Sequence, residues 1–292
     1  MLNIKYLREH SFCCFFNILN NSVTCYSDVS YFWCFVINFM RYFITLMYQG
    51  AAYHGWQIQK NALSVQQLVN ESLSKILREP ITSTGSGRTD TGVHARGQVA
   101  HFDTSQRLTE QEHLHKFNAV LPHDISITKL VQATDNAHAR FDATSRSYRY
   151  FIHQKKDPFL RGMSYLFTPQ LNLEMMNKAA RQLVQYGKQN YASFSKSNTQ
   201  TTTFDCHIFR ADWHVLEEDQ LVFTITADRF LRGMVRAVVG TMLDIGTGST
   251  SIDDFVAIIN SQNRRKAGRS VDAGGLFLTE VTYPADIYRQ QD

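Results

Sequence analysis

The chain is organised around one stretch, Gly85-Ser86-Gly87-Arg88-Thr89-Asp90-Thr91-Gly92-Val93-His94-Ala95-Arg96-Gly97. Four glycines in thirteen residues, with one carboxylate among two arginines and a histidine, are untypical of a helix or strand interior. Glycine permits positive φ and close approach of a ligand to the backbone, so the stretch predicts a shaped loop. Strand-like runs at Ile81–Thr84 and Gln98–Asp103 flank it and would support it rigidly. The alternative is a turn whose Arg and His side chains are merely solvated.

The longer string from Gly87 to Ala95 closely resembles the catalytic loop of the tRNA pseudouridine synthase A family. The hallmark of that family is G-R-T-D-x-G-V-H-A, in which the Asp is the nucleophile. The resemblance implies that Asp90 is the nucleophile, with His94 at the substrate. Arg88, two positions before Asp90, would favour the ionised carboxylate, and it would orient that carboxylate or hold phosphate.

Composition places the chain among ordinary globular proteins. It has 292 residues and a formal net charge of +4, which permits an anionic partner without requiring one. The histidines and Cys206 show no metal-ligand spacing, and no phosphate-binding loop or dinucleotide fingerprint is present. We therefore expect no metal and no cofactor.

Residues 1–39 differ from the rest of the chain, because few of them are charged and four of the five cysteines lie there. A membrane anchor needs about 18 largely apolar residues, and polar residues interrupt every long run here. A signal peptide fits neither the flanks nor the length, and a zinc site lacks its ligand spacing. We favour translation from Met40, which opens the first clean strand, and treat 1–39 as an atypical leader outside the fold.

From Met40 onward the periodicity predicts the order β-α-β-β-α-β twice. The first set covers residues 40–139 and carries the glycine-rich loop, and the second covers 140–292. Ser64 with Gln67 predicts a capping box before the first helix, and Pro80 ends that helix. The sequence thus predicts an α+β fold of two tandem ferredoxin-like halves, with a cleft at their seam. The family resemblance implies the same pseudouridine-synthase fold.

A second informative stretch runs from His138 to Tyr150. Arg146, Tyr148 and Tyr150 share one face of a predicted strand, and Arg beside Tyr suits phosphate and a stacked base. An edge strand with solvated arginines is the alternative. The stretch resembles the family's H-A-R-F-x-A-x-x-R-x-Y-x-Y segment, which implies that Tyr148 lies against the target base.

A third stretch, Phe230–Gly240, opens an otherwise apolar helix that carries Arg236. Arg236 would be costly to bury unless a carboxylate met it, and the alternative is an outer, solvated position beside Arg232. The stretch resembles the family's M-V-R-x-x-V-G helix, which implies that Arg236 is the buried partner of Asp90. The segment after Ala273 resembles the family's G-L-x-L string, which implies that Leu276 packs at the pocket.

The resemblance covers nearly all of residues 40–292. It implies a cytoplasmic, homodimeric tRNA pseudouridine synthase that acts on uridines 38, 39 and 40 of the anticodon arm. Two rivals remain: a non-catalytic RNA-binding protein with a ferredoxin-like sheet, and an Asp-dependent hydrolase or phosphotransferase. An intact Asp90 with Arg236 argues against the first, and the second would need a cluster of metal-binding carboxylates that the sequence lacks.

Overall fold

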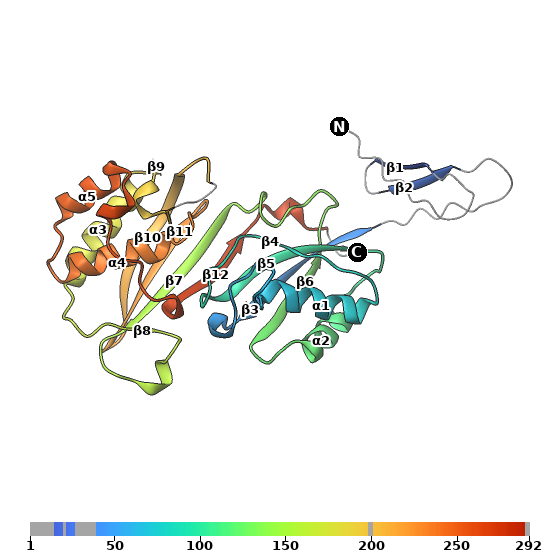
Figure 1. Cartoon of the computed structure of the whole chain (residues 1–292), viewed down its shortest axis with the longest axis horizontal. Coiled ribbons are helices and arrows are strands. Elements are labelled where there is room, and N and C mark those ends of the chain that lie inside the picture. Colours follow the sequence, from blue (N-terminus) through green and yellow to red (C-terminus); the bar gives the residue numbers. More distant parts are fainter. Residues whose placement is uncertain (1–14, 20–21, 27–38, 198–200, 290–292) are drawn as a thin grey trace.

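The computed structural model describes residues 15–19, 22–26, 39–197 and 201–289. Strands β1 (Phe15–Leu19) and β2 (Ser22–Tyr26) pair antiparallel with each other and form a sheet of their own (Figure 1). The rest of the predicted leader, apart from Phe39, lies outside the described residues, so a start at Met40 stays a prediction. Within the described ranges, no helix has both the length and the apolar character that a membrane span needs.

The first set of elements occupies the right-hand part of Figure 1, and the second set occupies the left-hand part. The first comprises β3 (Met40–Tyr48), α1 (Val65–Leu77), β4 (Thr84–Gly85), β5 (His94–Thr104), α2 (Glu110–Val120) and β6 (Ile125–Gln132). The second comprises β7 (Ser145–His153), β8 (Tyr165–Leu166), α3 (Leu173–Gln185), β9 (Lys188–Asn190), β10 (Asp205–Glu217), β11 (Gln220–Ala227), α4 (Met234–Gly246), α5 (Ile252–Ser261) and β12 (Leu276–Thr282). The chain therefore has mixed α+β content, as predicted.

Two local predictions needed correction. The strand expected at Ile81–Thr84 is reduced to β4, whereas β5 begins at His94, inside the stretch predicted to be loop. The Ser64 hydroxyl caps α1 by accepting from Gln67 N, but the Gln67 side chain donates to Glu71 instead of returning to the cap. Only half of the predicted capping box therefore forms.

A single ten-stranded sheet runs through both parts of the molecule. Its path is β6-β3-β5-β12-β7-β11-β10-β9, with β4 paired to β5 and β8 paired to β7. The last long strand, β12, lies between β5, to which it is parallel, and β7, to which it is antiparallel. The C-terminal strand thus joins the two parts through continuous backbone hydrogen bonding.

Each part has its own apolar core between the sheet and its helices. In the first, alternate residues Tyr42, Ile44 and Leu46 of β3 pack with the buried stripe of α1. In the second, α3 and α4 cover β10 and β11, and eleven of the thirteen α4 residues are buried. A helix that is apolar on almost every side must pack against other parts of the protein on every side. This packing holds the first residues of α4 in place.

The two cores meet at the seam through shared residues. Tyr148 of β7 packs against both cores. Val93 at the end of the glycine-rich loop belongs to the second core, and Leu278 of β12 belongs to the first. The loop and β7 are therefore held against each other by buried apolar contacts.

Candidate active site

The loop from Ser86 to Val93 is held by the first part of the molecule at its beginning. Ser86 N donates to Val99 O (2.7 Å) and the Ser86 hydroxyl donates to Gln98 Oε1 (2.6 Å). Gln98 Nε2 in turn donates to Gly87 O (3.0 Å). Gln98 is fully buried, so this hydrogen-bond network anchors the first residues of the loop to β5.

The middle of the loop rests on the segment after β3. Trp56 N donates to Thr89 O (3.3 Å), and the Tyr48 hydroxyl is 2.8 Å from Thr89 Oγ1. Gly55 has φ +85°, and a Cβ there would lie 2.3 Å from Thr89 O. Only glycine allows this approach, and the neighbouring Thr89 is buried as a result.

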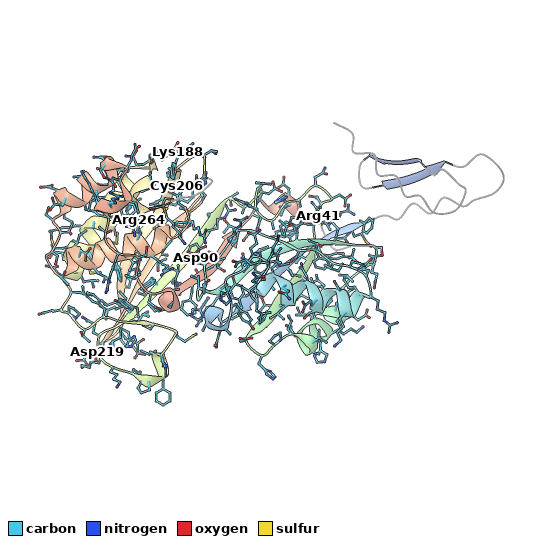
Figure 2. The ribbon with its side chains drawn as sticks, in the orientation of Figure 1. Arg41, Asp90, Lys188, Cys206, Asp219 and Arg264 are labelled. Atoms are coloured by element: carbon cyan, nitrogen blue, oxygen red, sulfur yellow. The ribbon has the colours of Figure 1, made fainter. Side chains whose placement is uncertain are left out.

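Asp90 follows at the tip of the loop, where Gly92 with φ +78° completes a turn closed by Val93 N donating to Asp90 O (3.1 Å). Its side chain remains 28% exposed, so a substrate can reach the carboxylate. Figure 2 places Asp90 in the middle of the molecule, between the helices of the two parts. The carboxylate therefore lies where the two parts of the molecule meet.

The arginine that faces Asp90 is Arg232, and this corrects the expected contact with Arg236. Arg232 Nε lies 3.4 Å from Asp90 Oδ1, and the Arg232 side chain is 61% exposed. Arg236 Nε instead donates to Val271 O (2.6 Å) and is half-buried. The reason is the geometry of the helix start: Arg232 precedes the left-handed Gly233, whereas Arg236 lies on α4 and faces the segment before β12.

Tyr148 lies close enough to Asp90 for the two groups to interact electrostatically, and its predicted place against the target base stays a prediction. Burial raises the pKa of its hydroxyl to about 12, and the negative charge of Asp90 contributes to the same shift. The Phe230 ring meets the Tyr148 ring edge-on at 5.2 Å between centroids. Tyr148 therefore presents a neutral hydroxyl and a fixed ring next to Asp90.

The other predicted site residues lie in different environments. Arg88 is exposed on the loop, and Leu276 is buried where β12 begins, opposite Tyr150. Arg146 does reach the loop, but through the carbonyl of Ser86 (3.2 Å). Tyr48 and Trp56, which support Thr89, were not predicted as site residues.

His94 is a correction, because the structure gives it a structural position. It is 1% exposed, its Nδ1 accepts from Gly50 N (3.1 Å), and its Nε2 lies 2.8 Å from Gly162 O. Since Nδ1 accepts, Nε2 carries the proton and donates. Burial lowers the pKa of His94, and the ring stacks on Phe277 at 4.6 Å. Both nitrogens are thus occupied within the protein, so neither is free for a substrate.

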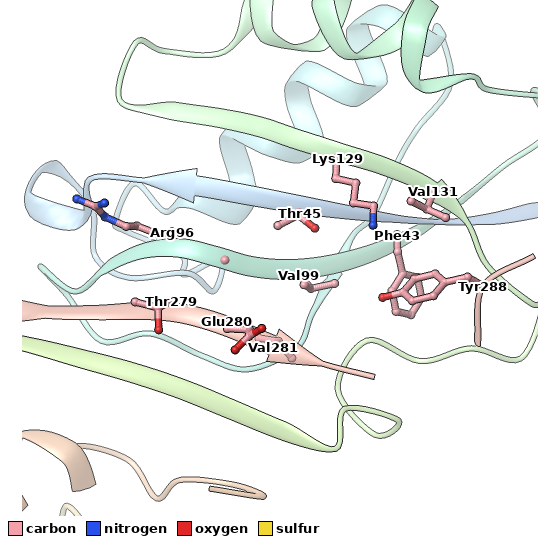
Figure 3. Close-up of a pocket in the computed structure, with 11 residues that line it drawn as sticks. Phe43, Thr45, Arg96, Val99, Lys129, Val131, Thr279, Glu280, Val281 and Tyr288 are labelled. Carbon is pink, nitrogen blue, oxygen red and sulfur yellow. The ribbon is translucent and has the colours of Figure 1, made fainter. Parts of the chain in front are cut away.

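A hollow of about 250 Å³ lies elsewhere, on the sheet face that carries Phe43 and Thr45 (Figure 3). Strands β3, β5, β6 and β12 line it, and Asp90 does not. Among the described residues, His, Cys, Asp and Glu side chains form no group of three or more that could hold a metal ion.

Comparison with known proteins agrees with the resemblance of the three motifs. A family model described as tRNA pseudouridine synthase matches residues 44–142 and 179–284. A tRNA pseudouridine synthase A of Parabacteroides distasonis is 47% identical over 253 residues, which cover 86% of this chain and 99% of that protein. Proteins of the same name from Bacteroides fragilis (47%; 85% and 98% covered) and Bacillus subtilis (36%; 84% and 99% covered) match similarly. The chain therefore belongs to the tRNA pseudouridine synthase family.

Proposed function

We propose that this chain isomerises uridine to pseudouridine in tRNA, with Asp90 as the acting carboxylate. The observation that carries the proposal is the accessible Asp90 carboxylate at the seam, beside an arginine and the neutral hydroxyl of Tyr148. The relatives that match over almost their whole length are named for this activity.

The chemistry suits these groups. The N1–C1′ bond of uridine breaks, the uracil rotates, a C5–C1′ bond forms, and the hydrogen of C5 is lost while N1 gains one. The base must leave the stack to do so, and an aromatic ring such as Tyr148 can receive it. A carboxylate can assist by covalent attack or by taking a proton from the sugar, and both routes need an ionised Asp90. Arg232 Nε, 3.4 Å from Asp90 Oδ1, places a positive charge beside this carboxylate.

The same proposal extends to the fold of each half, to the target uridines and to the assembly and location of the protein. We propose that each half is a ferredoxin-like unit, since the strand orders β6-β3-β5-β4 and β12-β7-β11-β10 both read 4-1-3-2 within their halves. From the family resemblance we also propose uridines 38, 39 and 40 of the anticodon arm as targets, a homodimer, a cytoplasmic location and a catalytic role for Arg236.

The test is the rate of tritium release from tRNA carrying [5-³H]uridine, for wild type, Asp90→Asn and Asp90→Ala. A covalent or proton-transfer group without a substitute should cost several orders of magnitude, while tRNA binding stays nearly unchanged. Asp286→Asn is the control, because Asp286 is exposed and outside the seam. Retention of a tenth of wild-type turnover in Asp90→Asn would overturn the role of Asp90. Wild-type binding without release would support the non-catalytic alternative.

A further inference from the structure

The Arg146 guanidinium is surrounded by backbone carbonyls. Nη1 donates to Ala143 O (2.9 Å) and Asp228 O (2.7 Å), and Nη2 donates to Arg140 O (2.6 Å) and Ser86 O (3.2 Å). These acceptors come from three separate segments: the turn before β7, the start of the Asp90 loop, and the end of β11. One side chain thus links segments that lie 60 residues before it and 82 residues after it in the sequence.

This arrangement leaves Arg146 little capacity to bind a phosphate. A guanidinium has five N–H groups, and four of them are used by these carbonyls. Within the described residues, no carboxylate forms an ion pair with Arg146, and burial lowers the pKa of the guanidinium. A partly buried charge is costly, so the carbonyl contacts are what stabilise it here.

Two of the linked segments carry the groups of the proposed active site. Ser86 begins the loop four residues before Asp90, and Asp228 lies four residues before Arg232. Asp228 is itself fixed, since its Oδ1 accepts from His207 N (2.8 Å) and Arg229 N (2.7 Å). The distance between Asp90 and Arg232 therefore depends on two anchors that Arg146 joins.

Arg146 is also coupled to the third group. It lies two residues before Tyr148 on β7, hence on the same face of the strand. Its positive charge lowers the pKa of Tyr148, opposing the effect of Asp90. A displaced guanidinium would therefore alter the tyrosine as well as the loop.

We propose that Arg146 is a positioning residue for the isomerisation: it sets the Asp90 loop and the Arg232 segment relative to Tyr148, and it does not contact tRNA. This replaces the phosphate-binding role predicted from sequence, and it rests on the proposed function.

The kinetic test is Arg146→Lys, which keeps the charge but offers a point-like ammonium with three donors in place of the planar fork. A displacement of about 1 Å at a catalytic group can cost about 100-fold, so we expect a loss of that order in the single-turnover rate at saturating enzyme. The dissociation constant for tRNA should stay within about twofold, with its salt dependence unchanged. Arg149→Lys is the control, because Arg149 lies on the same strand with an exposed side chain.

The opposite result identifies a phosphate contact. In that case tRNA would bind more weakly, the slope of log K against log salt would fall by about one, and the rate at saturating enzyme would be retained. That outcome overturns the proposal. If Arg146→Ala folds, guanidinium at millimolar concentration should restore part of its rate, whereas methylammonium should not.

Hydrogen exchange without tRNA separates this proposal from the proposed function. Amides of 86–93 and 228–232 should exchange faster in Arg146→Lys than in Arg149→Lys, whatever reaction the protein catalyses. Unchanged exchange in both segments would overturn the positioning role even if the enzyme makes pseudouridine. If the wild-type protein made no pseudouridine but the exchange rates of the two variants differed as expected, only the proposed function would be rejected.

Discussion

The two halves of the molecule contribute to the candidate site in different ways. The first half supplies Asp90 on a loop whose shape comes from glycines and buried polar contacts. The second supplies Tyr148 from a strand and the two arginines from the start of α4, which are elements fixed by an apolar core. The Asp90 carboxylate is thus held by backbone geometry, whereas the groups around it are held by side-chain packing.

The comparison predicts that small changes of backbone in the first half will be the most damaging. Gly55→Ala adds a Cβ 2.3 Å from Thr89 O at a residue with φ +85°. We expect the single-turnover rate to fall by about 100-fold or more, because the loop must shift at the residue before Asp90. Gly87→Ala is the control for folding, since a Cβ at Gly87 meets nothing within 4 Å. Equal melting temperatures and rates for Gly55→Ala and wild type would show that the loop does not depend on this contact.

The two arginines of the second half provide the next test. Arg236→Lys removes the Nε–H that donates to Val271 O and the planar fork, so we expect a 10- to 100-fold loss in the single-turnover rate. Arg232→Lys should cost only a few-fold, because its contact with Asp90 is long and its side chain is mostly exposed. A severe loss in Arg232→Lys with a mild one in Arg236→Lys would make Arg232 the working partner of Asp90.

These arginines also show which features of the site could not be predicted from the sequence. The Asp90 loop and the position of Tyr148 were predictable, because both follow from local patterns of glycine and of alternation along a strand. The choice between Arg232 and Arg236 was not, since it depends on how α4 is rotated against a loop 142 residues away. The contacts of Arg146 could not be predicted for the same reason: its carbonyl partners at Ser86 and Asp228 are distant in sequence.

Acid should destabilise the first half through His101. Burial lowers its pKa to about 4, and the charges of Arg41 and His138 contribute, while Asp103 and Asp142 oppose them. Its Nδ1 accepts from Ala139 N (3.0 Å) in the segment that precedes β7. The unfolded state binds a proton below about pH 6.5, whereas the folded state does so only near pH 4. Stability is therefore fully present above about pH 6.5 and is lost as the pH falls toward 4.

The measurement is the free energy of unfolding of wild type and His101→Gln at pH 7 and pH 4.5. The shift sets an upper limit of about 3 kcal/mol for the loss due to His101, and screening by solvent will reduce it. His101→Gln keeps an acceptor for Ala139 N but cannot be protonated, so it should lose less stability in acid than wild type does. Parallel losses in the two proteins would contradict a buried neutral His101.

The smallest effect is expected from deleting residues 1–39, which the sequence predicts to lie outside the fold. Strands β1 and β2 pair with each other, and both edges of β3 are already taken by β5 and β6, so this hairpin adds no strand to the ten-stranded sheet. The charges of the segment cancel, two basic against two acidic residues, and the net charge of +4 and its attraction for RNA are unchanged. Turnover and tRNA affinity should stay within about twofold. Mass spectrometry of the protein from its native cell checks the related prediction of a start at Met40, which peptides from within residues 1–39 would contradict. A large loss of activity on truncation would instead give the segment a place in the site.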